Sequence, residues 1–169
     1  MDSSWLSLLL TRELLAFSRE LDLFRDESLI WSTVPGISNS AGTLTLHVCG
    51  NLQHFVGAVL GGSGYERNRD LEFSSRDIAR AELQANLTTT TEVVQTVLAA
   101  FPEERLLEEY PDVLGGLRVS TGLFVLHLGT HLAHHLGQAG YLRRALTGEN
   151  KSSGPIAMQA LSGMPGSNA

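Results

Sequence analysis

The stretch from Ser120 to Leu146, STGLFVLHLGTHLAHHLGQAGYLRRAL, is apolar on almost every side of a helix, yet it carries four of the six histidines of the chain. A helix that is apolar all round is typical of the interior of a domain. We expect one buried helix that begins near Ser120 and ends near Leu146, with Gly148 as its stop signal. Other helices must then cover it.

Three further segments repeat apolar residues at helical spacing, and almost nothing alternates with period two. Glycines at 61, 62 and 64 end the second segment, and the sequence SSRD from Ser74 to Asp77 fits a capping box at the start of the third. The polar stretch YERNRDLEF between them predicts a long crossing connection. The expected helices run from about residue 5 to 25, 44 to 60, 74 to 100 and 120 to 146.

Four long amphipathic segments in one chain predict an all-α fold, a four-helix bundle. We expect one domain over residues 1–150 and a loosely ordered, Gly- and Ser-rich tail over 151–169. Because the connection between the 44–60 and 74–100 helices is longer than an antiparallel turn requires, we expect an up-down-down-up arrangement. The alternative is up-down-up-down.

Charge and cysteine content exclude several classes of protein. The formal charge of −6 and the scattered distribution of the 12 Lys and Arg residues argue against nucleic-acid binding. Cys49 is the only cysteine, so the chain is not a disulfide-linked secreted scaffold. No signal peptide or membrane-spanning stretch is evident, and we expect a cytoplasmic protein that acts on neither nucleic acid nor membrane.

The histidines of the 120–146 helix have a spacing that suits a metal ion. His127, His131 and His135 follow one another at intervals of four residues, which lets adjacent imidazoles bind one ion. His134 lies to the other side of His131, so we assign it to a neighbouring contact. The competing interpretation is that these are ordinary buried or interface histidines that bind nothing.

A third ligand should come from a facing helix, and the 44–60 helix offers His47 and His54. They are about 10 Å apart along the axis and cannot share one ion. His47 lies in the apolar run LTLHV, whereas His54 lies beside Gln53, which favours His47.

Two stretches resemble the DinB-like superfamily, whose members include the YfiT and DinB proteins. They are SAGTLTLHVCGNLQHFVGAVLGG at 40–62 and THLAHHLGQAGYLRR at 130–144, and the resemblance covers about residues 1–148. It implies a four-helix bundle and the metal ligands His47, His131 and His135. Many members have Arg where this chain has Leu136, which puts any substrate contact of that Arg in doubt. His127 is an extra histidine with no fixed role in the family pattern, so the pair His127 and His131 stays open as an alternative.

The resemblance also implies a range of functions. Characterised relatives include transferases that use low-molecular-weight thiols, and members are often dimers. The chain is therefore expected to be a metal-binding protein with an open three-histidine site, either a thiol-dependent S-transferase or a metal-dependent hydrolase. We expect zinc or nickel, a small-molecule substrate or thiol, and a homodimer. The alternative is a non-catalytic, metal-stabilised bundle that serves as a stress-related binding or sensor module. Haem ligation is a weaker alternative, because the HxxxH pair suits a small metal ion better.

Several other residues are candidates for supporting roles. Asn51, one turn after His47, and Gln138, three residues after His135, are candidates for ligand or cofactor contacts. Cys49 is expected to face away from the metal as a buried thiol. Arg143, with its neighbour Arg144, is a candidate for an anionic thiol cofactor. No Asp or Glu lies near the histidines in sequence, so no carboxylate base can be named.

Overall fold

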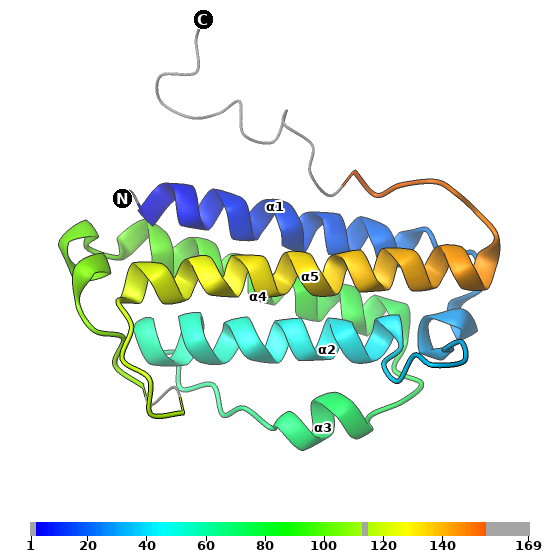
Figure 1. Cartoon of the computed structure of the whole chain (residues 1–169), viewed down its shortest axis with the longest axis horizontal. Coiled ribbons are helices and arrows are strands. Elements are labelled where there is room, and N and C mark those ends of the chain that lie inside the picture. The colour runs from blue at the N-terminus through cyan, green and yellow to red at the C-terminus, as the bar shows by residue number, and fades with distance from the viewer. Residues whose placement is uncertain (1–2, 113–114, 155–169) are drawn as a thin grey trace, which may run out of the picture.

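The computed structural model describes residues 3–112 and 115–154, and within these ranges its regular elements are all helices, with no strand. The all-α prediction is confirmed. None of the described helices has the length and apolarity needed to cross a bilayer. Four of the helices are long, and a short fifth lies between the second and third of them (Figure 1): α1 (Ser3–Asp22), α2 (Ala41–Leu52), α3 (Arg69–Ser74), α4 (Arg80–Ala100) and α5 (Thr121–Thr147).

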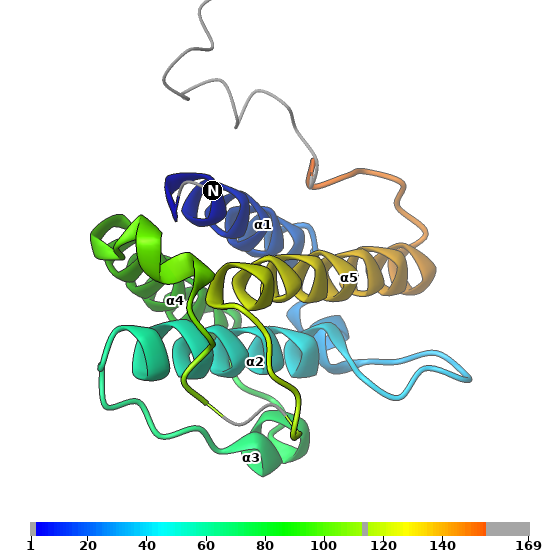
Figure 2. The same cartoon turned by 60° about the vertical axis from the view of Figure 1, so that its left-hand side comes forward.

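The four long helices lie side by side. α1 packs against α4 and α5, and α2 packs against the same two helices from the other side. In Figure 1 the chain runs from left to right along α1 and α5, and from right to left along α2 and α4. Figure 2 shows α3 below α2, on the outside of the four. Because α2 and α5 run in opposite directions and touch, the middle of one helix faces the middle of the other.

Apolar residues at helical spacing meet along the axis of the four helices. Leu14 and Phe17 of α1, Leu83 of α4 and Leu132 of α5 are all at most 1% exposed. The expectation that α5 is enclosed on every side is wrong, however, because Leu123 is 57% exposed. With helices packed two by two, each helix keeps one outward face, and on α5 this face is more apolar than usual.

Both ends of α5 agree with the prediction from sequence. The Ser120 hydroxyl accepts a hydrogen bond from the Leu123 amide, which satisfies one free N–H of the first turn. Gly148 follows the last turn at φ 71°, a left-handed conformation that glycine adopts without steric cost. α1 ends at Asp22, before the expected residue 25.

The predicted capping box at SSRD is wrong. Ser74 is the last residue of α3, and α4 begins at Arg80 after Ala79, whose side chain makes no capping bond. Asp77 has φ 58°, which a continuous helix does not allow. The sequence pattern also missed α3 itself, whose N-cap Asn68 accepts a hydrogen bond from the Leu71 amide.

The second predicted helix changes type midway. α2 ends at Leu52, and a π-helical segment, Gln53–Leu60, continues from it. Because a π-helix bonds each amide one residue further back than an α-helix does, it rotates the residues that follow. This separates His54 from the face of His47: the His54 ring lies 3.5 Å from a carboxylate oxygen of Asp112.

A buried ion pair joins the C-terminal turns of α1 and α5. The Arg143 guanidinium is completely buried and donates from Nε to the Glu20 carboxylate, which is 2% exposed. Arg143 also donates to the carbonyl of Lys151, and Arg19 Nε donates to the Ser153 carbonyl at 2.9 Å. Arg143 therefore cannot bind an anionic cofactor, and residues 151–154 are attached to the helices. Residues 155–169 of the predicted tail lie outside the described residues.

Replacing Glu20 with Gln should lower the free energy of unfolding by about 3–5 kcal/mol, because it leaves a buried guanidinium without its counter-charge. Urea denaturation followed by circular dichroism measures this change. Arg25→Gln removes the exposed pair of Arg25 with Glu149 and should leave the midpoint unchanged. If the wild-type protein and both variants unfolded at the same urea concentration, the buried pair would contribute nothing to stability.

Candidate metal centre

Three imidazoles meet between the middle of α2 and the middle of α5. His47 Nε2 lies 3.2 Å from His131 Nε2, and His135 Nε2 lies 3.0 Å from the same atom. A ligand nitrogen from each ring lies within 4.8 Å of the other two. The structure thus brings together the three residues predicted as ligands.

The spacing of the nitrogens resembles that of ligands around a small cation. In a tetrahedral zinc site with Zn–N bonds of 2.0–2.1 Å, two ligand nitrogens are about 3.3 Å apart. The two closest separations here, 3.2 and 3.0 Å, are slightly shorter. Small rotations of the rings would therefore accommodate an ion. Three nitrogen ligands leave at least one coordination position for another molecule.

The tautomers of the rings make this arrangement unfavourable without a cation. His47 donates from Nδ1 to Glu72, and His135 donates from Nδ1 to Gln138 Oε1 at 2.8 Å. A neutral imidazole carries one N–H, so both rings turn a bare Nε2 lone pair towards His131. The single proton that His131 could hold at Nε2 would satisfy only one of them. A bound cation would satisfy all three.

A carboxylate from outside the two helices orients His47. Glu72 of α3 is 6% exposed, and its Oε2 lies 2.9 Å from His47 Nδ1. Arg67 donates to both carboxylate oxygens, from Nε at 2.7 Å and from Nη2 at 2.8 Å. Arg67 Nη2 also lies 3.4 Å from His47 Nδ1, but the carboxylate is nearer and can only accept. A carboxylate behind a ligating histidine fixes its tautomer and strengthens it as a ligand.

The charge state of Glu72 follows from these contacts. Burial alone would raise the pKa of the carboxyl group, but the hydrogen bonds from Arg67 and His47 outweigh it and keep this pKa below its ordinary value. The carboxylate therefore stays ionised near neutral pH. It keeps the proton of His47 on Nδ1 and leaves Nε2 free as a ligand.

His131 and His135, the two members of the cluster on α5, are neutral at pH 7. Burial, together with the nearby imidazoles of His135 and His47, lowers the pKa of His131 to about 4. Burial also lowers the pKa of His135, although its bond to Gln138 acts in the opposite direction. Neutral imidazole is the form that binds metal, so little proton competition remains near neutral pH.

Gly50 makes room for the supporting carboxylate. A Cβ atom at position 50 would lie 2.2 Å from Glu72 Oε1 and 2.8 Å from Glu72 Cδ. Only glycine lets the backbone of α2 approach this closely. The glycine three residues after His47 thus has a steric reason.

Sequence reasoning missed Glu72 and Arg67. Both lie in the polar connection, Glu72 25 residues after His47, and periodicity assigns no partner to a residue of such a stretch. Asn68 followed by the apolar residues Leu71 and Phe73 was a signal for a short helix. Nothing in the pattern indicated that this helix lies against α2.

The remaining histidines lie outside the cluster. The His127 ring is 6.4 Å from that of His131 between centroids and stacks on Phe124, so the alternative pair of His127 with His131 is not the arrangement found. His134 is exposed and touches the His135 ring at its edge, with 5.2 Å between centroids. Neither has a nitrogen in the three-histidine group.

Cys49 is a buried structural thiol. Its side chain is fully buried, and this burial raises the pKa to about 12 even though a hydrogen bond with Thr90 opposes the shift. The thiol therefore stays protonated near neutral pH. Its burial agrees with the expectation from sequence, and its protonation excludes Cys49 as a nucleophile.

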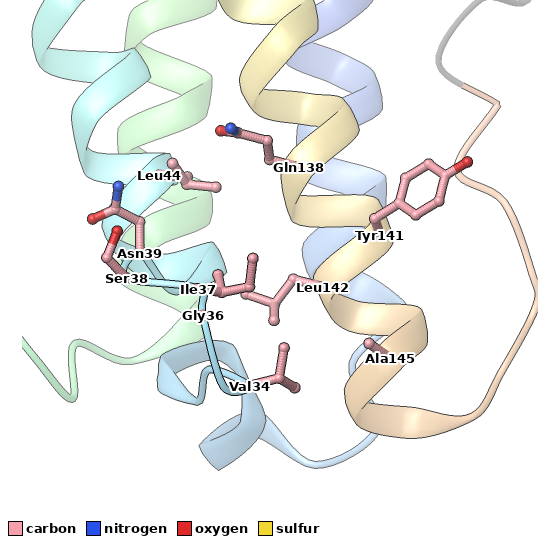
Figure 3. Close-up of a pocket in the computed structure, with 10 residues that line it drawn as sticks. All are labelled: Val34, Gly36, Ile37, Ser38, Asn39, Leu44, Gln138, Tyr141, Leu142 and Ala145. Carbon is pink, nitrogen blue, oxygen red and sulfur yellow. The ribbon is translucent and has the colours of Figure 1, made fainter.

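Two cavities lie along the groove between α2 and α5, one on either side of the three histidines. One, of about 470 Å³, lies towards the start of α2 and the end of α5, and includes Leu44 and Gln138. Figure 3 shows the Gln138 side chain extending from α5 towards α2, above Ile37 and Leu142. The other, of about 700 Å³, is lined by both Asn51 and His131 and therefore reaches the cluster directly.

No protein-family model matches the chain, and neither a curated protein nor a solved structure matches it.

Replacing Gly50 with Ala should force Glu72 away from His47 and destabilise the protein by about 1–3 kcal/mol, the usual cost of overpacking. Nitrogen chemical shifts of the His47 ring report the lost hydrogen bond, and urea denaturation reports the stability.

Gly137→Ala is the matched control, because no heavy atom lies within 4 Å of an added Cβ there. An exposed helical glycine replaced by alanine should stabilise the protein by about 0.5–1 kcal/mol. If Gly50→Ala behaved like Gly137→Ala, the close approach of Glu72 would be refuted.

Proposed function

We propose that the chain is a metal-dependent protein of the DinB-like superfamily, with His47, His131 and His135 as the ligands of one divalent cation. The observation that carries the proposal is the convergence of three imidazole Nε2 atoms. Two of these rings, His47 and His135, donate their Nδ1 protons to Glu72 and Gln138, so their Nε2 atoms carry no proton. Three neutral nitrogen ligands favour zinc or nickel. An up-down-down-up order of the four helices belongs to the proposal, and the chain directions in Figure 1 support it.

The reaction we propose is the transfer of a small thiol to an organic electrophile, with hydrolysis as the second candidate. When bound, a divalent cation with an open position lowers the pKa of a thiol or a water molecule beside it. The residues of the chain hold the imidazoles in place: Glu72 and Gln138 orient two of them, and Arg67 keeps Glu72 ionised. The 700 Å³ cavity beside His131 favours an enzyme over a purely structural site, because it gives a substrate access to the cluster.

Assembly and location belong to the same proposal. We propose a homodimer formed through the outward face of α5, where Leu123 is 57% exposed, Leu126 39% and Tyr141 76%. Residues of this kind are enriched at interfaces between subunits. A cytoplasmic location agrees with the single, buried cysteine.

Protein purified without nickel resin should hold about one divalent ion per chain, and His131→Ala should lose it, because two imidazoles rarely retain a metal alone. Elemental analysis by mass spectrometry measures the content. His134→Ala, which removes an exposed neighbour of His135, should keep the ion. An equal metal content in both variants would contradict the proposed ligand set.

Glu72→Gln should weaken zinc binding by about 10–100-fold, the usual effect of removing the group behind a ligating histidine. Competition with a chromophoric chelator measures the affinity. Glu66→Gln changes an exposed carboxylate of the same connection and is the control. A Glu72→Gln protein that binds zinc as tightly as the Glu66→Gln protein would remove Glu72 from the site.

Cobalt-substituted protein distinguishes a thiol-using enzyme from a non-catalytic module. A thiol that reaches the ion should add a sulfur-to-cobalt charge-transfer band to the spectrum, and its S-methyl analogue should add none. Thiol consumption with a panel of electrophiles then measures turnover. A spectrum unchanged by every thiol, with no thiol consumed, rules out the transferase and leaves the hydrolase or the sensor module.

A further inference from the structure

The cavity beside His131 has walls suited to an apolar molecule. Phe55 and Phe124 lie edge to face with 5.1 Å between ring centroids, and Tyr110 supports Phe124 at 4.4 Å while its hydroxyl donates to the Phe55 carbonyl at 2.7 Å. The other walls are Val119, Leu123 and Leu128. Such rings favour a planar or aromatic guest, which they can contact edge-on or face-on.

No charged side chain lines this cavity among the described residues. Its polar side chains are Asn51, His127 and His131, and the rest are apolar residues and a glycine. A carboxylate, phosphate or ammonium group would lose its hydration there and find no counter-ion on the walls. The body of the occupant is therefore uncharged, which separates it from a charged thiol cofactor.

Asn51 is a polar group that lacks a partner. Its side chain is 8% exposed, and its Oδ1 is buried without a hydrogen bond from any described residue. A buried amide left unpaired costs about 1–3 kcal/mol, so such groups are normally satisfied. Asn51 lines the cavity together with His131. Rotation of the Asn51 amide towards the cavity would let an occupant that donates one hydrogen bond at this end satisfy Oδ1.

We propose that the cavity binds the organic substrate of the site, an uncharged molecule with an aromatic or compact apolar body and one hydroxyl or carboxamide group, which Asn51 recognises. Asn51 lies one helical turn after His47, so the bound group is held on the same face of α2 as the cation ligand. The inference rests on the proposed function for the role of this molecule as substrate. The binding itself can be tested separately.

The test uses benzyl alcohol and its apolar isostere ethylbenzene as probes of the zinc-loaded protein. Titrations followed by methyl NMR shifts of the leucines and valines give both dissociation constants. In Asn51→Leu, the ratio of the two constants should move in favour of ethylbenzene by about tenfold, because only the alcohol loses a hydrogen bond. Val34→Ala, in the 470 Å³ cavity, is the control and should leave the ratio unchanged. Benzylammonium should bind at least tenfold more weakly than the alcohol.

An unchanged ratio in Asn51→Leu, or tight binding of benzylammonium, would overturn the inference. Zinc content and probe binding are measured on the same samples, so the two proposals can fail separately. A protein that binds the alcohol through Asn51 but retains no metal contradicts the metal site and supports the cavity. A protein that retains metal but binds neither probe contradicts the cavity alone.

Discussion

The hydrogen bond between Glu72 and His47 is the interaction on which the candidate site depends. It joins two parts of the chain that are distant in sequence: the middle of α2, and the short helix α3 together with Arg67 just before it. Without the carboxylate, the Nδ1 proton of His47 would have no acceptor inside the protein, and its tautomer would be free to change. The ionised carboxylate is in turn tolerable in a buried position because Arg67 neutralises it with two hydrogen bonds.

Two of the buried ion pairs among the described residues have different consequences. Glu20 and Arg143 connect α1 to α5 and the segment after it, far from the histidines, and therefore act on stability and on the position of residues 151–154. Glu72 and Arg67 lie beside the histidines and act on the protonation of a ligand. Both pairs consist of an arginine whose planar guanidinium matches a carboxylate, the combination best suited to burial.

Much of the fold, and two members of the three-histidine cluster, could be predicted from the sequence because they rest on local periodicity. The spacing of His131 and His135 places two rings on one helical face whatever the rest of the chain does, and Ser120 and Gly148 bound that helix by their own chemistry. The partners Glu72 and Arg67 could not be predicted, because their position depends on how a polar connection folds back over α2. The expected capping box failed for a related reason: Ser74 resembles a helix start but closes the short helix before it.

The π-helical segment after Leu52 has a consequence for how such a protein can evolve. His47 and Asn51 lie before it, and the aromatic wall of the larger cavity begins with Phe55 inside it. Each π-turn contains one more residue than an α-turn, so gain or loss of a single codon in this stretch rotates Phe55 and leaves His47 in register with His131 and His135. The aromatic wall of the cavity can thus change in one mutational step between descendants that keep the three-histidine cluster.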